Sequence, residues 1–90
     1  MGSEKTKSII KSKTTKEGIR ELVLFNDDFN TFDFVIETLI ELCEHDAIQA
    51  EQCAFMVHLK GKCAVKSGSF RELKPIQQEM LNRSLTASIK

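Results

Sequence analysis

Hydrophobic positions predict a strand and then a helix in the first half of the chain. The segment 21–25 (ELVLF) is a short apolar run that ends at Asn-Asp-Asp, which is typical of a strand followed by a turn. From Phe32 to Cys43, apolar residues recur at the three- and four-residue spacing of one helical face. Asn30 or Thr31 is placed to cap the N-terminus of that helix.

The same pattern predicts a second helix followed by a second strand. Asp46 and Gln49 have the spacing of a capping box, which predicts the start of the helix. Small apolar residues then line one helical face, and the helix is expected to end near Lys60 and Gly61. Gly61 is a natural end for this helix. The segment 62–67 (KCAVKS) that follows is typical of a short strand.

The C-terminal part of the chain predicts a third helix and a closing strand. Proline fits the first position of a helix but not its middle, so we expect the third helix to run from Pro75 to about Asn82. Residues 69–74 are then extended or looped. The alternation of Leu85 with later apolar residues predicts an edge strand in 84–90 (SLTASIK).

This order of elements, β-α-α-β-α-β, predicts a two-layer α+β sandwich. A small three-stranded antiparallel sheet would bury one face against three helices. Ninety residues are enough for one such domain and too few for two.

Charge divides the chain into an arm and a domain. Residues 1–20 carry six basic and two acidic side chains, a net charge of +4, whereas the remaining residues carry seven and eleven, a net charge of −4. We expect 1–19 to be a flexible basic arm and 20–90 to be the folded domain. The acidic domain offers no basic or aromatic stripe, and no apolar run is long enough to span a membrane, so we expect a cytoplasmic protein that binds neither nucleic acid nor membrane.

Metal and thiol chemistry find little support in the spacing of candidate ligands. Counting from Asp28, an EF-hand loop would need glycine and glutamate where Asp33 and Leu39 stand, so calcium is excluded. An odd number of cysteines without an export signal predicts reduced thiols. We expect no cofactor, no metal and no enzymatic activity, although a thiol or zinc protein stays open as an alternative. The candidate ligands for it are Cys43, His45, Cys53, His58 and Cys63.

The stretch FNDDFNTFDF (25–34) brings polar and apolar residues together at the predicted turn. It has an ordinary interpretation as a strand-to-helix turn with phenylalanines in the core. A more specific one is a site for a free α-amino group, which is an ammonium with three donors at neutral pH. Asp28 would supply the countercharge, and the Asn26 oxygen and a neutral His58 would accept hydrogen bonds.

Two motifs, LVLFNDDFNTFDFVIETL and AFMVHLKGK, closely resemble the ClpS adaptor family. The resemblance covers residues 21–66 well and implies a monomeric bacterial adaptor. ClpS proteins bind proteins with a destabilising first residue, typically Leu, Phe, Tyr or Trp, and pass them to a Clp AAA+ unfoldase and its peptidase. The resemblance implies that the unfoldase is of ClpA or ClpC type and that its N-terminal domain is the partner. It also implies that the basic arm engages the unfoldase. A Clp-associated module without amine binding is the alternative.

The resemblance also implies roles for individual residues. Asn26, Asp28 and His58 would hold the substrate's α-ammonium. Two positions depart from the family, because Phe32 and Ala54 stand where methionines are usual, and we expect Phe32 to fill space that Ala54 leaves. The side-chain pocket would be lined by Leu24, Asp27, Asn30, Phe32, Val35, Ala54 and Val57.

Overall fold

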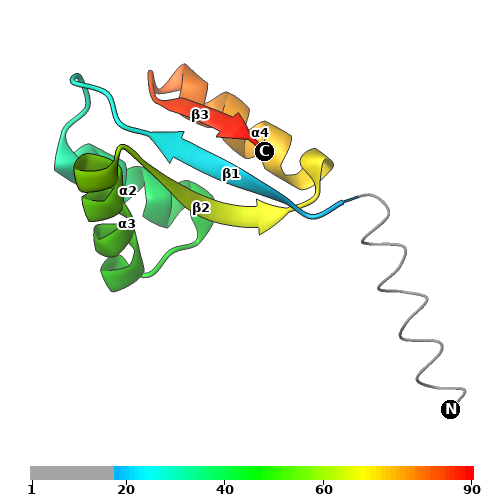
Figure 1. Cartoon of the computed structure of the whole chain (residues 1–90), viewed down its shortest axis with the longest axis horizontal. Helices are drawn as coiled ribbons and strands as arrows, with labels where there is room; N and C mark the ends of the chain where they lie inside the picture. Colours follow the sequence, from blue (N-terminus) through cyan, green and yellow to red (C-terminus); the bar gives the residue numbers. More distant parts are fainter. Residues whose placement is uncertain (1–17) are drawn as a thin grey trace, which may run out of the picture.

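The computed structural model describes residues 18–90, and the order β-α-α-β-α-β and the α+β class are confirmed (Figure 1). Apart from residues 18 and 19, the expected basic arm lies outside the described residues. The elements are β1 (Arg20–Phe25), α2 (Phe32–Cys43), α3 (Ala47–Lys60), β2 (Lys62–Gly68), α4 (Phe70–Asn82) and β3 (Thr86–Ile89).

The three strands form an antiparallel sheet in the order β2-β1-β3. β1 is therefore the central strand, and β3 is the edge strand that the alternating pattern predicted. Leu22 and Leu24 of β1 are fully buried and belong to the core, together with Ala87 of β3. Phe25, the last residue of β1, pairs with Lys62 and Thr86. The chain then leaves the sheet and enters the loop toward α2.

The pairing of β1 with β2 contains a bulge. Leu22 pairs with Lys66 but Val23 pairs with Ala64, which leaves Val65 as an extra residue on β2. The buried ring of His45 lies beside it, with Nε2 2.7 Å from the Val65 carbonyl oxygen. A carbonyl oxygen only accepts, so Nε2 carries a proton and donates a hydrogen bond to this carbonyl at the bulge.

The helices cover one face of the sheet. α4 packs against all three strands, while α2 and α3 pack on each other and α3 also packs against β2. Leu39 of α2, Leu73 and Met80 of α4 are completely buried where these layers meet. The result is the predicted two-layer arrangement. Within residues 18–90, no helix is both long enough and apolar enough to cross a membrane.

The expected start of the third helix is wrong by five residues. α4 begins at Phe70, because Ser69 and Glu72 form a reciprocal capping box: the Glu72 N–H donates to Ser69 Oγ, and the Ser69 N–H donates to Glu72 Oε1. Pro75 lies inside the helix, where it removes one hydrogen bond to the carbonyl of Arg71. Arg71 and Pro75 are both exposed, so water can reach that carbonyl.

Candidate functional site

A cavity of about 620 Å³ opens where the end of β1, the start of α2 and one side of α3 meet. This volume lies in the range of about 300–1000 Å³ that is usual for small-molecule sites. One part of the lining is polar and the other is apolar. The cavity is lined by Asn26, Asp27, Asp28, Asn30, Phe32, Val35, Ala54, Phe55, Val57 and His58.

The end of α3 is joined directly to the end of β1. Gly61 caps α3 in the left-handed conformation, with φ 92°, and its N–H donates to the Val57 carbonyl at 3.0 Å. The Gly61 carbonyl in turn accepts from the backbone N–H of Asn26 at 2.9 Å. This contact holds Asn26 near His58, which lies in the last turn of α3.

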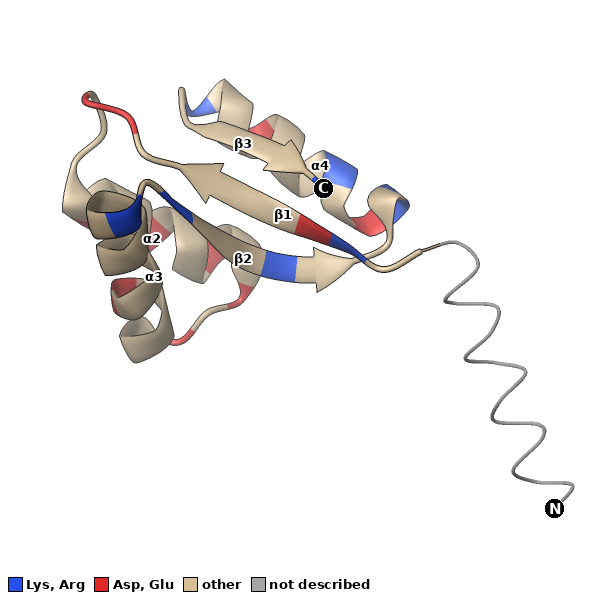
Figure 2. Ribbon diagram, in the orientation of Figure 1, with Lys and Arg blue, Asp and Glu red and all other residues tan. Residues whose placement is uncertain are grey.

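Asp27 organises the acidic loop between β1 and α2 (Figure 2). Its Oδ1 accepts from the backbone N–H groups of Phe29 and Asn30, both at 2.8 Å, and its Oδ2 accepts from Asn30 Nδ2 at 2.9 Å. Desolvation alone would raise the pKa of Asp27. The hydrogen bonds from Asn30 and Phe29 outweigh it and lower the pKa below its ordinary value.

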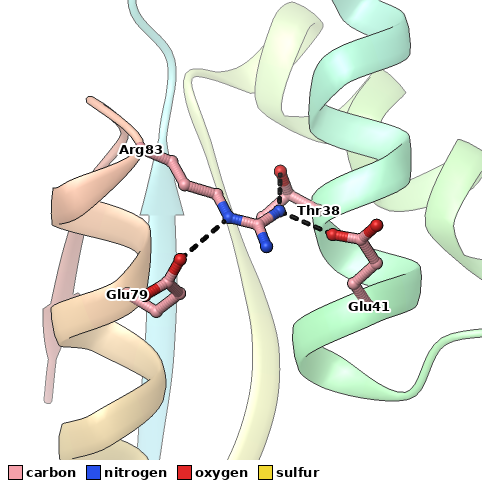
Figure 3. Close-up of polar contacts among 4 residues, drawn as sticks. All are labelled: Thr38, Glu41, Glu79 and Arg83. Carbon is pink, nitrogen blue, oxygen red and sulfur yellow. Dashed lines mark hydrogen bonds and ion pairs between the residues drawn. The ribbon is translucent and has the colours of Figure 1, made fainter.

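The loop is also tied to the turn between α4 and β3. Asn30 Nδ2 donates to the carbonyl of Ser84 at 2.9 Å, just beyond α4. The neighbouring Arg83 joins α4 to α2: Nε contacts Glu79 Oε2 at 3.2 Å, and Nη1 contacts Glu41 Oε1 at 2.7 Å (Figure 3). Nη1 also donates to Thr38 Oγ1 at 3.4 Å. Asp27 and Asn30 therefore give the loop its shape and have few free polar atoms.

Three polar side chains of the lining have their hydrogen-bonding groups available. Asn26, Asp28 and His58 are exposed, and among residues 18–90 their side chains form no hydrogen bond or ion pair with protein groups. They provide a carboxylate, an amide oxygen and an imidazole on one side of the cavity. Such a set can accept hydrogen bonds from a small cation.

The opposite side of the cavity is apolar. Val35, Ala54 and Val57 are buried and present small aliphatic groups. Phe32 and Phe55 meet there edge to face, with ring centroids 4.9 Å apart and an interplanar angle of 62°. Both rings line the cavity together with Ala54.

Nine of the ten residues that the sequence suggested for a site line this one cavity. The exception is Leu24, which is fully buried in the core and is not part of the lining. Phe55 was missed, because the helical pattern assigned the inner face of α3 to Ala54 and Val57. A usable signal was present: Phe55 and His58 are three residues apart and therefore share a helical face.

Two of the cysteines, Cys43 and Cys53, have little reactivity. Burial raises the pKa of Cys43 to about 11. Burial, and then a hydrogen bond with Cys63, raise the pKa of Cys53 to about 12. Both thiols are protonated at neutral pH and are poor nucleophiles and metal ligands. In the part of the chain that the structure describes, no three Cys, His, Asp or Glu side chains are grouped to hold a metal ion.

Comparison with known proteins agrees with the two motifs identified in the sequence, LVLFNDDFNTFDFVIETL and AFMVHLKGK. Residues 15–88 match the family model described as "ATP-dependent Clp protease adaptor protein ClpS". The chain is similar to ClpS adapter proteins from Acetivibrio thermocellus (40% identity, 70% of this chain and 66% of the relative) and Hydrogenovibrio crunogenus (39%, 63% and 57%). It thus spans less than two thirds of the length of these two relatives. A ClpS adapter protein from Shewanella denitrificans is 32% identical over 89% of this chain and 80% of its own.

A solved structure shares the fold. Agrobacterium tumefaciens ClpS2, determined in complex with L-phenylalaninamide, superimposes with a TM-score of 0.68 over 80% of this chain and 94% of its own. The sequence identity is 15%, so this likeness supports the fold alone.

Proposed function

Because the chain belongs to the ClpS family of ATP-dependent Clp protease adaptors, we propose that its cavity binds the free N-terminus of proteins whose first residue is bulky and hydrophobic. The bound protein would then be handed to a Clp AAA+ unfoldase. One observation carries the proposal: three polar groups without a hydrogen-bond partner among residues 18–90 share a single cavity with an apolar hollow.

Each half of the cavity suits one half of such a ligand. An α-ammonium has three donors and no acceptor, and Asp28, Asn26 and His58 can accept all three hydrogen bonds. The C-terminus of α3 adds a partial negative charge on the same side. The first side chain would enter the apolar part beside Val35 and Ala54, where burying an apolar group is favourable.

The ligand of the structural neighbour and the layout of this domain are compatible with the proposal. L-Phenylalaninamide, bound to the neighbour, combines a free amine with an aromatic side chain. In this chain the basic arm joins the domain at the start of β1, and the cavity lies beyond the end of that strand. The two ends of β1 are roughly 17 Å apart. An unfoldase could therefore engage the basic arm while a substrate occupies the cavity.

Fluorescence anisotropy with labelled peptides tests amine recognition. A peptide that begins with Phe should bind, whereas its N-acetylated form and a form beginning with Met should bind at least tenfold more weakly. Acetylation removes the charge and two of the three donors without changing the side chain. Equal affinity for the free and acetylated peptides would rule the proposal out.

Variants then assign the binding to this cavity. Asp28→Asn and His58→Ala should each weaken binding at least tenfold, because hydrogen bonds to a charged group contribute about 1.5–3 kcal/mol. Glu37→Gln is the matched control, since Glu37 is an exposed acid on α2 outside the cavity. Circular dichroism should be unchanged in all three variants. Unchanged binding in Asp28→Asn would contradict the assignment.

A further inference from the structure

The contact between Phe32 and Phe55 gives the apolar half of the cavity a stiff aromatic wall. The rings come from different helices, Phe32 from the first turn of α2 and Phe55 from the middle of α3. Phe32 is half-buried against the core, while Phe55 is 49% exposed. The rings meet edge to face, and both line the cavity.

Ala54 leaves room in front of this wall. It is 2% exposed, it lines the cavity, and its methyl group is the smallest side chain among the apolar lining residues. The branched side chains Val35 and Val57 stand beside it. The hollow therefore combines a rigid aromatic side with an open aliphatic side.

A planar ring is the best partner for such a hollow. Aromatic rings gain energy from edge-to-face contact beyond the area that they bury, and an aliphatic side chain does not. A phenylalanine side chain also has only two rotatable torsions, so the wall cannot reshape itself around a branched ligand as a flexible methionine would. The ligand ring would be the third ring of this group and could add a second edge-to-face contact to the existing one.

We propose that the Phe32–Phe55 pair, together with the space left by Ala54, makes the cavity selective for aromatic first residues over leucine. This inference rests on the proposed function, because it concerns the first residue of the same bound N-terminus. It makes Phe55 a specificity-determining residue.

Peptides that differ only in their first residue test the selectivity. Dissociation constants measured for Phe-, Trp- and Leu-initiated peptides should favour the aromatic residues by about 2- to 10-fold in the unmodified protein. Phe55→Leu removes one ring from an exposed position and should bring the Phe-to-Leu ratio close to one. Phe70→Leu is the matched control: Phe70 is 48% exposed at the start of α4, outside the cavity, and its loss should leave the ratio unchanged.

Ala54→Met gives a second, independent test. The added side chain would occupy the open part of the hollow, so the affinity for the Trp peptide should fall more than that for the Leu peptide. Ala54 is buried, so circular dichroism must first show that this variant folds. If it does not fold, the exposed Phe55→Leu variant decides the question.

The outcomes separate this inference from the proposed function. If the free amine is required but Phe and Leu bind equally well, or if Phe55→Leu leaves their ratio unchanged, the inference is overturned and amine recognition stands. If no free-amine peptide binds better than its acetylated form, the proposed function fails and the inference fails with it.

Discussion

Asp27 and Asp28 are adjacent carboxylates in one loop, and they differ in what they contact. Asp27 receives three hydrogen bonds from Phe29 and Asn30, whereas Asp28 receives none from residues 18–90. Asp27→Ala should therefore lower the free energy of unfolding at pH 7 by about 1 kcal/mol, because the carboxylate is partly exposed. Asp28→Ala should leave it unchanged. Urea denaturation of both variants measures the difference.

The effect of Asp27 should also depend on pH in a defined direction. Its pKa is lowered in the folded protein, so its contribution is complete above the unfolded value of about 3.9 and is lost as the pH falls through the lowered folded value. The stability gap between the wild type and Asp27→Ala should thus narrow below pH 4. A gap that widened in acid would contradict the hydrogen-bonding pattern.

Substitution of His45 should affect the stability of the domain, whereas substitution of His58 should affect peptide binding. His45 is buried and donates to the Val65 carbonyl at the bulge, while His58 is exposed at the cavity. His45→Ala should destabilise the domain by about 1–3 kcal/mol, because it leaves a buried carbonyl without a partner. His58→Ala should change the melting temperature little and weaken peptide binding at least tenfold. A stable His45→Ala protein would show that water replaces the ring.

At the scale of an element, the end of α3 depends on one glycine. Gly61 has a φ of 92°, and a Cβ added there would meet no atom within 4 Å, so the cost of a substitution is conformational and not steric. Gly61→Ala should destabilise the protein by about 1–2 kcal/mol, and Gly61→Asn by less, since asparagine tolerates the left-handed region. Urea denaturation of the pair checks the order. Equal losses would mean that conformation is not the cause.

The helices also show where sequence reasoning succeeded and failed. α2 and α3 were predicted within a residue or two because their apolar periodicity and the caps at Thr31 and Asp46 agree. α4 was placed five residues too late, because the rule for proline was applied without the competing capping box at Ser69 and Glu72. The capping box fixes the start of the helix at Phe70. The helix tolerates Pro75 because the carbonyl of Arg71, which loses its hydrogen bond, can be reached by water.

At the scale of the whole molecule, the cavity depends on how β1, α2 and α3 are arranged in space. Motifs at the end of β1, at the start of α2 and near the end of α3 were enough to name nine lining residues. The tenth, Leu24, was placed in the pocket by the family resemblance, but in this chain it is fully buried in the core and is not part of the lining. The spacing of Phe55 from His58 could have suggested it as a lining residue, but its contact with Phe32 depends on the packing of α2 on α3.

The pH dependence of peptide binding is a property of the assembled cavity and its ligand. An α-amino group has a pKa of about 8, so affinity for a Phe-initiated peptide should fall about tenfold for each pH unit above that value. The protein groups with resolved shifts do not titrate between pH 7 and 9.5: Asp27 is already ionised, and the pKa values of Cys43 and Cys53 are about 11 and about 12. Asp28→Asn should flatten the dependence because it removes the countercharge. Anisotropy titrations at half-unit intervals, with circular dichroism to verify folding, measure both curves, and a flat wild-type curve would mean that the cavity does not recognise the ammonium.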